Sequence, residues 1–338
     1  MDRISLALMD IIQRSFPLSS RPYEQLAERV GVSSGEVRQR LARFKEEGQL
    51  RQISAIFNTG AIGYHSSLAA LAVPEERVEE AAAALNHYPG VSHNYLRPGQ
   101  YYNIWFTLAV PPWESLEDVA RQLTIDAGGW PLLVLPAVKK YKLEVVLDLL
   151  DEAESDDPPP DTGIPRLEGA SAFDASPENI RIVRCIQEDL PLVEEPFAVW
   201  GEILGMDGDE LIGLIREWIG QGFIRRFAAV LNHRRVGFHA NGIVVWHAPE
   251  DRIDEYGAVL AGRPEVSHCY HRPAYPEWPY NLYAMIHGRS TDECQAIAAR
   301  LAEAAGLPDY RILFSTREFK KIRLKLFWDE PPLLGESA

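Results

Sequence analysis

One eight-residue pattern occurs twice in this chain and constrains its fold more than any other feature. Val-Ser-His-x-Tyr-x-Arg-Pro begins at Val91 and again at Val266, 175 residues later. Other matches follow in the same order, such as Gly63–His65 with Gly237–His239 at the nearly equal offset of 174. An ordered series of matches at an almost constant spacing indicates an internal duplication. We therefore expect two copies of one fold.

The offset between the copies increases slowly toward the end of the chain. Tyr102–Asn103 match Tyr280–Asn281 at an offset of 178, and Lys139–Lys140 match Lys320–Lys321 at an offset of 181. We interpret this increase as a few residues inserted in loops of the second copy.

A short acidic segment separates the two copies. Residues 151–176 carry eight acidic side chains and one basic one, a net charge of −7 within the −15 of the whole chain. This segment is rich in Pro, Asp, Glu, Gly and Ser, a composition typical of a flexible, self-repelling linker. The chain has no run of 18 apolar residues, no secretory signal pattern and only three widely spaced cysteines. We therefore expect a cytoplasmic protein without a membrane span, a disulfide framework or a zinc site.

Each copy begins with the pattern of three short helices. In the first copy, apolar spacing predicts helices over residues 4–15, 21–31 and 33–48, with Gly31 ending the second helix and a serine capping the third. Three such helices with a tight turn are typical of a helix-turn-helix, here expected to be winged.

The remainder of each copy has strand and helix patterns in the order strand, helix, strand, strand, helix, strand. This order is that of a ferredoxin-like βαββαβ domain. In the first copy the last strand is expected to run without a break over 132–146. The predicted fold class is α+β, a tandem duplication of a winged helix-turn-helix followed by a ferredoxin-like domain. The expected boundaries are 1–52 and 177–226 for the helix-turn-helix regions, 53–150 and 227–330 for the ferredoxin-like domains, and 151–176 for the linker.

The repeated motif lies on a predicted strand, and alternate residues of a strand point to opposite faces. Its histidine, tyrosine and arginine should therefore form a polar row on a face that is usually apolar in this kind of sheet. An imidazole, a phenol and a guanidinium in one row suit the wall of a pocket for an anionic ligand. The two expected rows are Val91, His93, Tyr95 and Arg97 in the first copy, and Val266, His268, Tyr270 and Arg272 in the second.

A winged helix followed by a ferredoxin-like domain resembles the Lrp/AsnC family of transcriptional regulators. The expected recognition helices do not favour DNA binding, because phosphate neutralisation by Lys and Arg supplies most of the affinity for DNA. The charged side chains between Glu36 and Glu47 sum to +1, and those between Asp207 and Glu217 sum to −3. Nucleic acid is therefore not the expected partner.

The two hairpin motifs carry a more specific resemblance. "VSHNYLR…YYNIWF" and "VSHCYHRPAYPEWPYNLYAMIHG" resemble the two subunit signatures of the siroheme decarboxylases, a catalytic branch of the Lrp/AsnC-like fold. Their order fits a fused two-subunit form that acts as an internal pseudo-dimer, and the resemblance covers all but the linker. It implies that siroheme loses CO₂ from its C12 and C18 acetate groups, giving 12,18-didecarboxysiroheme for haem or for the modified haem of a nitrite reductase. It also implies no cofactor beyond the iron that siroheme carries.

This chemistry suggests roles for the polar rows. Protonation of the macrocycle and then of the exocyclic carbon needs a general acid that works near neutral pH, and histidine is the usual choice. We therefore expect His93 and His268 to be the general acids. Arginine binds carboxylates through two parallel hydrogen bonds, so Arg97 and Arg272 are the expected carboxylate clamps.

Further residues are candidates for contact with the substrate, although each also has a purely structural interpretation as a packed, ion-paired or hydrogen-bonded side chain. His271, His287 and Trp278 occur only in the second copy, where they could make the two copies differ in the acetate group on which they act. The sequence leaves open two alternative functions, a transcriptional regulator and a tetrapyrrole-binding protein without catalysis. It also leaves open whether whole chains assemble into a further homo-oligomer. The additional candidates for substrate contact are Tyr95, Tyr270, Arg51, Arg225, His65, His239, Asn103, Asn281 and Trp278.

Overall fold

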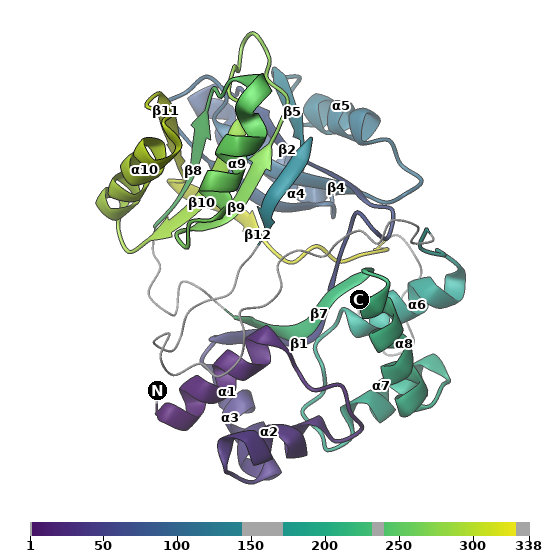
Figure 1. Ribbon diagram of the computed structural model, residues 1–338. Coiled ribbons are helices and arrows are strands. Elements are labelled where there is room, and N and C mark those ends of the chain that lie inside the picture. Colours follow the sequence, from purple (N-terminus) through teal and green to yellow (C-terminus); the bar gives the residue numbers. More distant parts are fainter. Residues whose placement is uncertain (1, 144–171, 232–239, 329–338) are drawn as a thin grey trace. The chain divides into compact units, whose positions relative to one another are not determined.

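The computed structural model describes residues 2–143, 172–231 and 240–328, and these residues form two compact units (Figure 1). A helical unit contains residues 2–63, 172–231 and 325–328, and a sheet unit contains residues 64–143 and 240–324. Each unit takes residues from both copies. The two compact units are therefore not the two copies. Within each unit, a part of the first copy packs against the matching part of the second.

The helical unit contains two groups of three helices, each followed by a strand. The ends of the helices agree with the sequence signals, since the Ser33 hydroxyl accepts a hydrogen bond from the Glu36 N–H and Gly31 ends its helix at a φ of 73°. None of the described helices has the length and apolar character needed to cross a lipid bilayer. The elements are α1 (Arg3–Arg14), α2 (Pro22–Val30), α3 (Ser34–Glu46) and β1 (Leu50–Phe57), and then α6 (Pro177–Ile186), α7 (Pro196–Leu204), α8 (Gly208–Gly220) and β7 (Ile224–Leu231).

The strands β1 and β7, which stand where wings were expected, pair with each other across the two copies (Figure 1). The Phe16 N–H donates to the Phe227 carbonyl, and the Leu190 N–H donates to the Ile53 carbonyl, both at 2.8 Å. These two hydrogen bonds are equivalent under the offset of 174. The end of each first helix is thus fixed to the strand of the other copy.

Basic side chains of α3 contact acidic side chains of the second copy. Lys45 lies 2.6 Å from Asp189, and Arg38 lies 3.5 Å from Glu194. These ion pairs join the two helical groups. They also compensate charge on the helix that would face DNA in a regulator, which reduces its attraction for phosphate.

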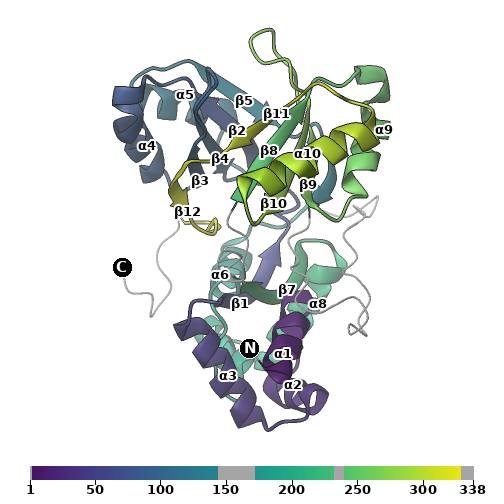
Figure 2. The ribbon, with the colours of Figure 1, turned by 90° about the vertical axis from the view of Figure 1, so that its left-hand side faces the viewer.

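The sheet unit has four layers, with α4 and α5 on one side, α9 and α10 on the other, and two five-stranded sheets between them (Figure 2). Short 3₁₀ turns at Glu75–Arg77 and Glu250–Arg252 precede α4 and α9. The helices are α4 (Val78–His87), α5 (Leu116–Asp126), α9 (Ile253–Ala261) and α10 (Thr291–Ala305). The first sheet has the order β12 (Arg317–Lys321), β3 (Val91–Leu96), β4 (Ile104–Val110), β2 (His65–Leu71), β5 (Leu132–Pro136), and the second has β11 (Tyr310–Phe314), β8 (Ala240–Trp246), β10 (Leu282–Gly288), β9 (Val266–His271), β6 (Lys139–Leu143).

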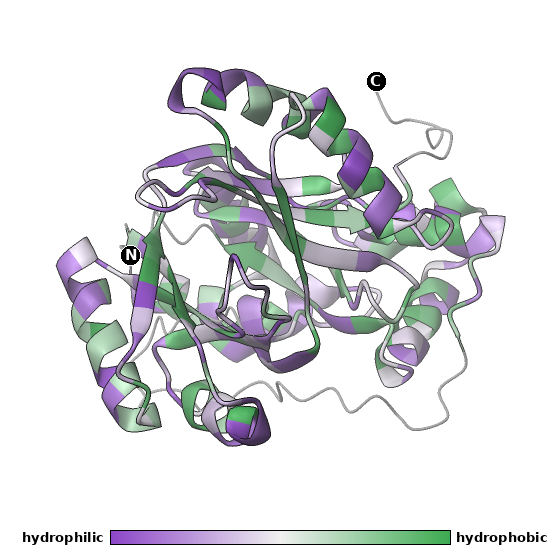
Figure 3. Ribbon diagram, turned by 90° about the horizontal axis from the view of Figure 1, so that it is seen from above, coloured by the Kyte–Doolittle hydropathy of each residue, from purple (hydrophilic) through white to green (hydrophobic). Residues whose placement is uncertain are grey.

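Three apolar clusters hold these layers together, and hydrophobic stretches alternate with hydrophilic ones along the strands in Figure 3. One cluster lies between the first sheet and α4 and α5, and another between the second sheet and α9 and α10. The third joins the two sheets, with Trp105 and Leu133 from the first sheet and Tyr283 and Leu313 from the second. The face of each sheet that lacks helices is therefore covered by the other copy.

The two copies exchange their last strands. The segment 132–146 was expected as one strand, but its described part, residues 132–143, forms β5 in the first sheet and β6 in the second, where β6 pairs with β9. Reciprocally, β12 of the second copy pairs with β3 of the first. Pro136 ends β5 because proline has no N–H to continue a strand ladder, and the Val138 N–H then donates to the His271 carbonyl at 2.9 Å.

The exchanged strands also correct the alignment of the copies. Their registers on β9 and β3 place Lys142 and Lys320 at equivalent positions, at an offset of 178. Our match of the two lysine pairs at 181 was therefore wrong by three residues. Lys142 Nζ donates to the Arg263 carbonyl at 2.9 Å, and Lys320 Nζ donates to the Asn86 carbonyl at 2.7 Å. Both lysines thus bind the carbonyl-rich ends of α9 and α4, where a cation is favourable.

Candidate active site

The repeated motif occupies β3 and β9, and each strand carries a β-bulge at its serine. In β3, Val91 pairs with Leu108 and His93 pairs with Thr107, so no residue of β4 stands opposite Ser92 in the strand ladder. A bulge shifts the alternation of faces. Val91 therefore packs in the cluster under α4 and α5, and the expectation that it shares a face with His93 was wrong.

The second copy has the same bulge. In β9, Val266 pairs with Ile286 and His268 pairs with Met285, so that Ser267 is passed over. Val266 is fully buried in the cluster under α9 and α10. In both copies the bulge places the serine beside the histidine, which the alternation of a regular strand would not do.

The remaining members of each expected row do lie together. The rings of His93 and Tyr95 are 6.2 Å apart between centroids, and the Arg97 guanidinium carbon lies 5.4 Å from the centroid of Tyr95. We call these three residues the first row. The second row consists of His268, Tyr270 and Arg272. The ring centroids of His268 and Tyr270 are 6.2 Å apart, and the Arg272 guanidinium carbon lies 4.6 Å from the Tyr270 centroid.

The arginines at the inner ends of the rows are buried between the two sheets. Arg97 is 1% exposed and donates to the Leu313 carbonyl of β11, whereas Arg272 is 8% exposed and donates to the Leu135 carbonyl of β5. Each arginine therefore binds the backbone of the opposite sheet. Burial lowers the pKa of Arg97 to about 10 and also lowers that of Arg272. A guanidinium keeps its proton in proteins, so both residues place a positive charge between the sheets.

The histidine of each row is held by the serine before it. In the first copy, Ser92 Oγ lies 3.0 Å from His93 Nδ1 and 2.9 Å from Thr107 Oγ1. His93 and His268 are partly exposed, unlike the arginines of their rows. The two serines were not among the site residues predicted from the sequence, although their recurrence in both motifs was the available signal.

The second copy adds a further histidine to this contact. Ser267 Oγ lies 2.9 Å from His268 Nδ1, 3.0 Å from His287 Nε2 and 3.2 Å from the Met285 carbonyl oxygen. Burial, with a smaller contribution from Lys321, lowers the pKa of His287 to about 4. His287 is therefore neutral at neutral pH.

Lys321 brings a second-copy cation to the first row. It is the β12 partner of His93 across the strand ladder, and it is close enough to His287 to affect the pKa of that histidine. A cation beside the partly exposed end of a row is suited to a substrate that carries several carboxylates.

His65 lies on the other face of the first sheet. It pairs with Val110, which belongs to the cluster under α4 and α5, and its side chain is exposed. The structure therefore does not bring His65 together with His93. Its expected counterpart, His239, lies outside the described residues.

Asn103 and Asn281 hold backbone rather than lining an opening. Asn103 accepts from the Val73 N–H at 2.9 Å and donates to the Val73 carbonyl at 2.7 Å, and Asn281 makes the same two bonds to Ala248. Each side-chain amide thus bonds one backbone N–H and one backbone carbonyl, as a residue of a paired strand would. Trp278 is 3% exposed and packs against Trp105 in the core between the sheets.

The two predicted arginines Arg51 and Arg225 belong to β1 and β7 of the helical unit. The side chain of Arg51 is exposed and that of Arg225 is partly buried. The rows, in contrast, belong to the sheet unit, so these arginines are not among the side chains that the sheet unit brings together.

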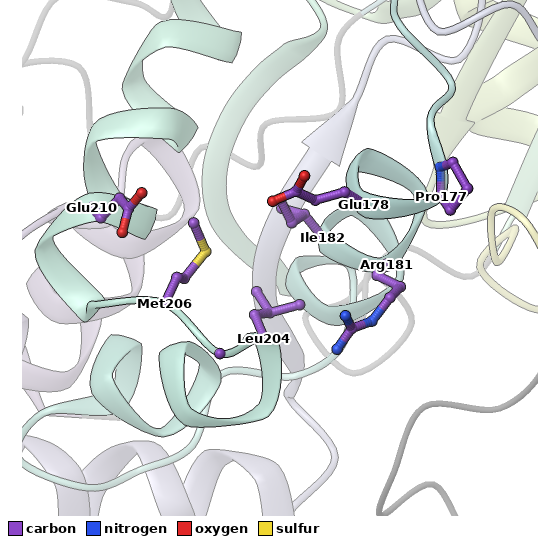
Figure 4. Close-up of a pocket in the computed structure, with 8 residues that line it drawn as sticks. Pro177, Glu178, Arg181, Ile182, Leu204, Met206 and Glu210 are labelled. Carbon is purple, nitrogen blue, oxygen red and sulfur yellow. The ribbon is translucent and has the colours of Figure 1, made fainter.

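The helical unit has a pocket of about 410 Å³ between α6 and the turn from α7 to α8 (Figure 4). Glu178 and Glu210 point into it together with one cationic side chain, Arg181. Two carboxylates against one guanidinium do not suit a ligand with many negative charges. The rows, with their arginines and Lys321, suit such a ligand better.

Comparisons with known proteins identify the family of this chain. The family model described as siroheme decarboxylase NirDL-like HTH domain matches residues 6–51 and 179–225, and that described as AsnC-like ligand binding domain matches residues 61–142 and 235–320. A siroheme decarboxylase of Hydrogenobacter thermophilus is 40% identical over 326 residues, which cover 96% of this chain and 95% of the relative. The chain belongs to the siroheme decarboxylase family.

Solved structures extend the family assignment to the whole fold. The crystal structure of the siroheme decarboxylase NirDL matches with a TM-score of 0.76 at 35% identity, covering 97% of this chain and 95% of that one. A second NirDL structure, in complex with an iron-uroporphyrin III analogue, matches with a TM-score of 0.74 at 35% identity, covering 94% and 92%. The predicted duplication and fold class are thereby confirmed for this member of the siroheme decarboxylase family.

Proposed function

We propose that this chain decarboxylates siroheme, removing CO₂ from the C12 and C18 acetate side chains to give 12,18-didecarboxysiroheme. The observation that carries the proposal is the pair of rows, each with a partly exposed histidine next to a tyrosine and a buried arginine. Membership of the siroheme decarboxylase family supports the same reaction. In this proposal the enzyme serves the formation of haem or of a modified haem.

The reaction needs a proton for each carboxylate that is lost. A ring–CH₂–CO₂⁻ group takes up one H⁺ and becomes ring–CH₃ and CO₂, so the electron pair of the broken C–C bond ends in a new C–H bond. When the macrocycle is transiently protonated beside the acetate, the ring can accept this electron pair. The proposed reaction therefore uses no cofactor beyond the iron that siroheme carries.

The rows divide this work between their residues. His93 and His268 supply the proton, because imidazole gains and loses a proton near neutral pH. The arginines and Lys321 provide positive charge that attracts the substrate carboxylates that do not react. The carboxylate that does react loses CO₂ more readily where it is less hydrated.

Two other functions would use the same fold. A transcriptional regulator is disfavoured because Lys45 and Arg38 of α3 are paired with carboxylates of the second copy. A tetrapyrrole carrier without catalysis would use the same cations but would need no general acid.

Anaerobic incubation with siroheme separates an enzyme from a carrier. Mass spectrometry of the recovered tetrapyrrole should show the loss of two CO₂ units. An unchanged mass with a shifted absorption spectrum would show binding alone and would refute the proposed reaction.

The roles of the two histidines are tested by His93→Gln and His268→Gln. We expect each variant to reduce turnover by about 10²- to 10⁴-fold at the acetate that its histidine serves, because that is the usual contribution of a general acid. Substrate affinity, measured by absorbance titration, should change much less. The assignment is wrong if both variants decarboxylate siroheme at the wild-type rate.

A further inference from the structure

The serine of each repeated motif lies beside the histidine that we propose as general acid. Ser267 Oγ has three neighbours in the second copy: His268 Nδ1, His287 Nε2 and the Met285 carbonyl oxygen. A hydroxyl has one hydrogen to donate and two lone pairs to accept with. A carbonyl can only accept, so the contact with Met285 requires the serine hydrogen. The hydroxyl oxygen then accepts one hydrogen bond from each histidine.

We propose that Ser267, anchored by His287 and the Met285 carbonyl, fixes His268 with a hydrogen on Nδ1, so that Nε2 exchanges the proton with the substrate. This inference rests on the proposed function for its chemical meaning. Ser267 and His287 act through His268 and are positioning residues.

The arrangement suits a group that must give up a proton and regain it. In the charged imidazolium, Nδ1–H donates to Ser267 while Nε2–H is the proton delivered to the exocyclic carbon of the substrate. The neutral ring that remains still carries the hydrogen on Nδ1 and keeps the same hydrogen bond. Water can then return a proton to Nε2, and neither the ring nor the serine has to reorient.

His287 can hold Ser267 in this way because it is neutral at neutral pH. Burial disfavours its charged form, and the charge of Lys321 acts in the same direction. The strand partner of His287 on β8 is the uncharged Asn241. A neutral His287 donates from Nε2 without placing a second positive charge beside His268.

In the first copy the serine has a different set of neighbours. Ser92 Oγ contacts His93 Nδ1 and the hydroxyl of Thr107, which itself accepts from the His93 backbone N–H at 3.2 Å. A hydroxyl partner can either donate or accept, so Ser92 can accept from Nδ1 or donate to it. The contact with Ser92 therefore does not by itself set the tautomer of His93, whereas we propose that the contact with Ser267 sets that of His268.

The tautomer can be read directly in the full-length protein without substrate. Protein labelled with ¹⁵N at histidine would be studied by long-range ¹H–¹⁵N correlation at a pH where His268 is neutral, with its signals assigned by their loss in His268→Gln. We expect Nδ1–H in the wild type, a shift toward Nε2–H in Ser267→Ala, and the wild-type pattern in Ser267→Thr, which keeps the hydroxyl. Ser92→Ala is the matched control and should leave the His268 signals in place. A wild-type His268 with Nε2–H, or no change in Ser267→Ala, would overturn the proposal.

Turnover supplies the second readout. Ser267→Ala should lower kcat by about 10- to 100-fold, the usual effect of losing the partner that orients a ligand or catalytic group. KM should change far less, and Ser267→Thr should recover most of the rate. A shifted tautomer with an unchanged kcat would also overturn the proposal. If the wild type did not decarboxylate siroheme at all, the proposed function would fail instead, and the spectra would show this separately because they require no turnover.

Discussion

Arg97 and Arg272 serve the fold in a way that their motif did not suggest. Each was expected to clamp a carboxylate, and in the structure each is buried and donates to a backbone carbonyl of the opposite sheet. Among the described residues no partner contacts Nε of either guanidinium. Contact with a substrate carboxylate remains a proposal, because these contacts establish only that both arginines join the two sheets.

Removing Arg97 should therefore cost stability. In Arg97→Ala the Leu313 carbonyl loses its donor and a cavity forms, so we expect a loss of about 2–4 kcal/mol in the free energy of unfolding. Urea denaturation measures this quantity. Arg121→Ala is the control, because that side chain is 70% exposed in a surface ion pair and should contribute under about 1 kcal/mol. Equal losses in the two variants would contradict a joining role for Arg97.

His287 should make stability depend on pH in a defined window. Its folded-state pKa is about 4, against an ordinary value of 6.5, so between these values the unfolded chain binds a proton that the folded chain does not. Stability due to this group is therefore full above about pH 6.5 and falls as the pH drops toward 4, by about 2–3 kcal/mol. Urea denaturation at several pH values should show a shallower fall in His287→Gln.

The exposed His87 provides the control for this experiment. His87→Gln should remove much less of the fall in stability than His287→Gln does. If His287→Gln reproduced the wild-type pH dependence, His287 would not be the group that resists protonation in the folded chain.

At the scale of elements, β6 fits against α9 through a close approach to a glycine. A Cβ at Gly257 would lie 2.4 Å from the ring of Tyr141, whose hydroxyl donates to Asp254 at 2.6 Å. The helix and the exchanged strand are thus matched in shape, although they come from different copies.

Two glycine-to-alanine changes within helices should have opposite effects. Gly257→Ala should lower stability by about 1–3 kcal/mol, because the methyl group overpacks the contact with Tyr141. Gly213→Ala in α8 should raise it by about 0.5–1 kcal/mol, because nothing lies within 4 Å of the new Cβ and alanine favours a helix. Urea denaturation compares the two, and adding Tyr141→Ala should remove most of the Gly257→Ala penalty. A gain in stability from Gly257→Ala would contradict the close fit.

Local patterns predicted most helices and the two rows, because capping residues and strand alternation are properties of neighbouring residues. The exchange of β6 and β12 could not be predicted in this way, since it depends on which edge strand is available in the other copy. The bulges at Ser92 and Ser267 depend on pairing with β4 and β10 for the same reason. Without the bulge, alternation placed Val91 beside His93, and without the register the face of His65 was unknown.

At the scale of the whole molecule, cutting the chain between its copies should leave the halves together. Three pairings cross the copies among the described residues: β1 with β7, β6 with β9, and β12 with β3. We expect a variant with a protease site inside 151–176 to elute as one species after cleavage and to keep its activity. Gel filtration under native conditions, with the uncut variant as control, measures this. Elution of two separate half-length species would show that the pairings do not hold the halves together.

The exchanged strand also determines how this gene can be recombined with its relatives. Residues 139–143 are encoded with the first copy, but they form the edge of the sheet that positions His268. In a chimaera joined within the linker, the first copy would come from a relative. The β6 strand beside the second row would then come from that relative, together with the rest of the first copy. To transplant the second site intact, an engineer must move β6 together with the second copy. The β12 strand, which pairs with β3, must then come from the protein that supplies the first copy. The segment that the gene encodes as one copy is thus different from the set of strands that shapes each site.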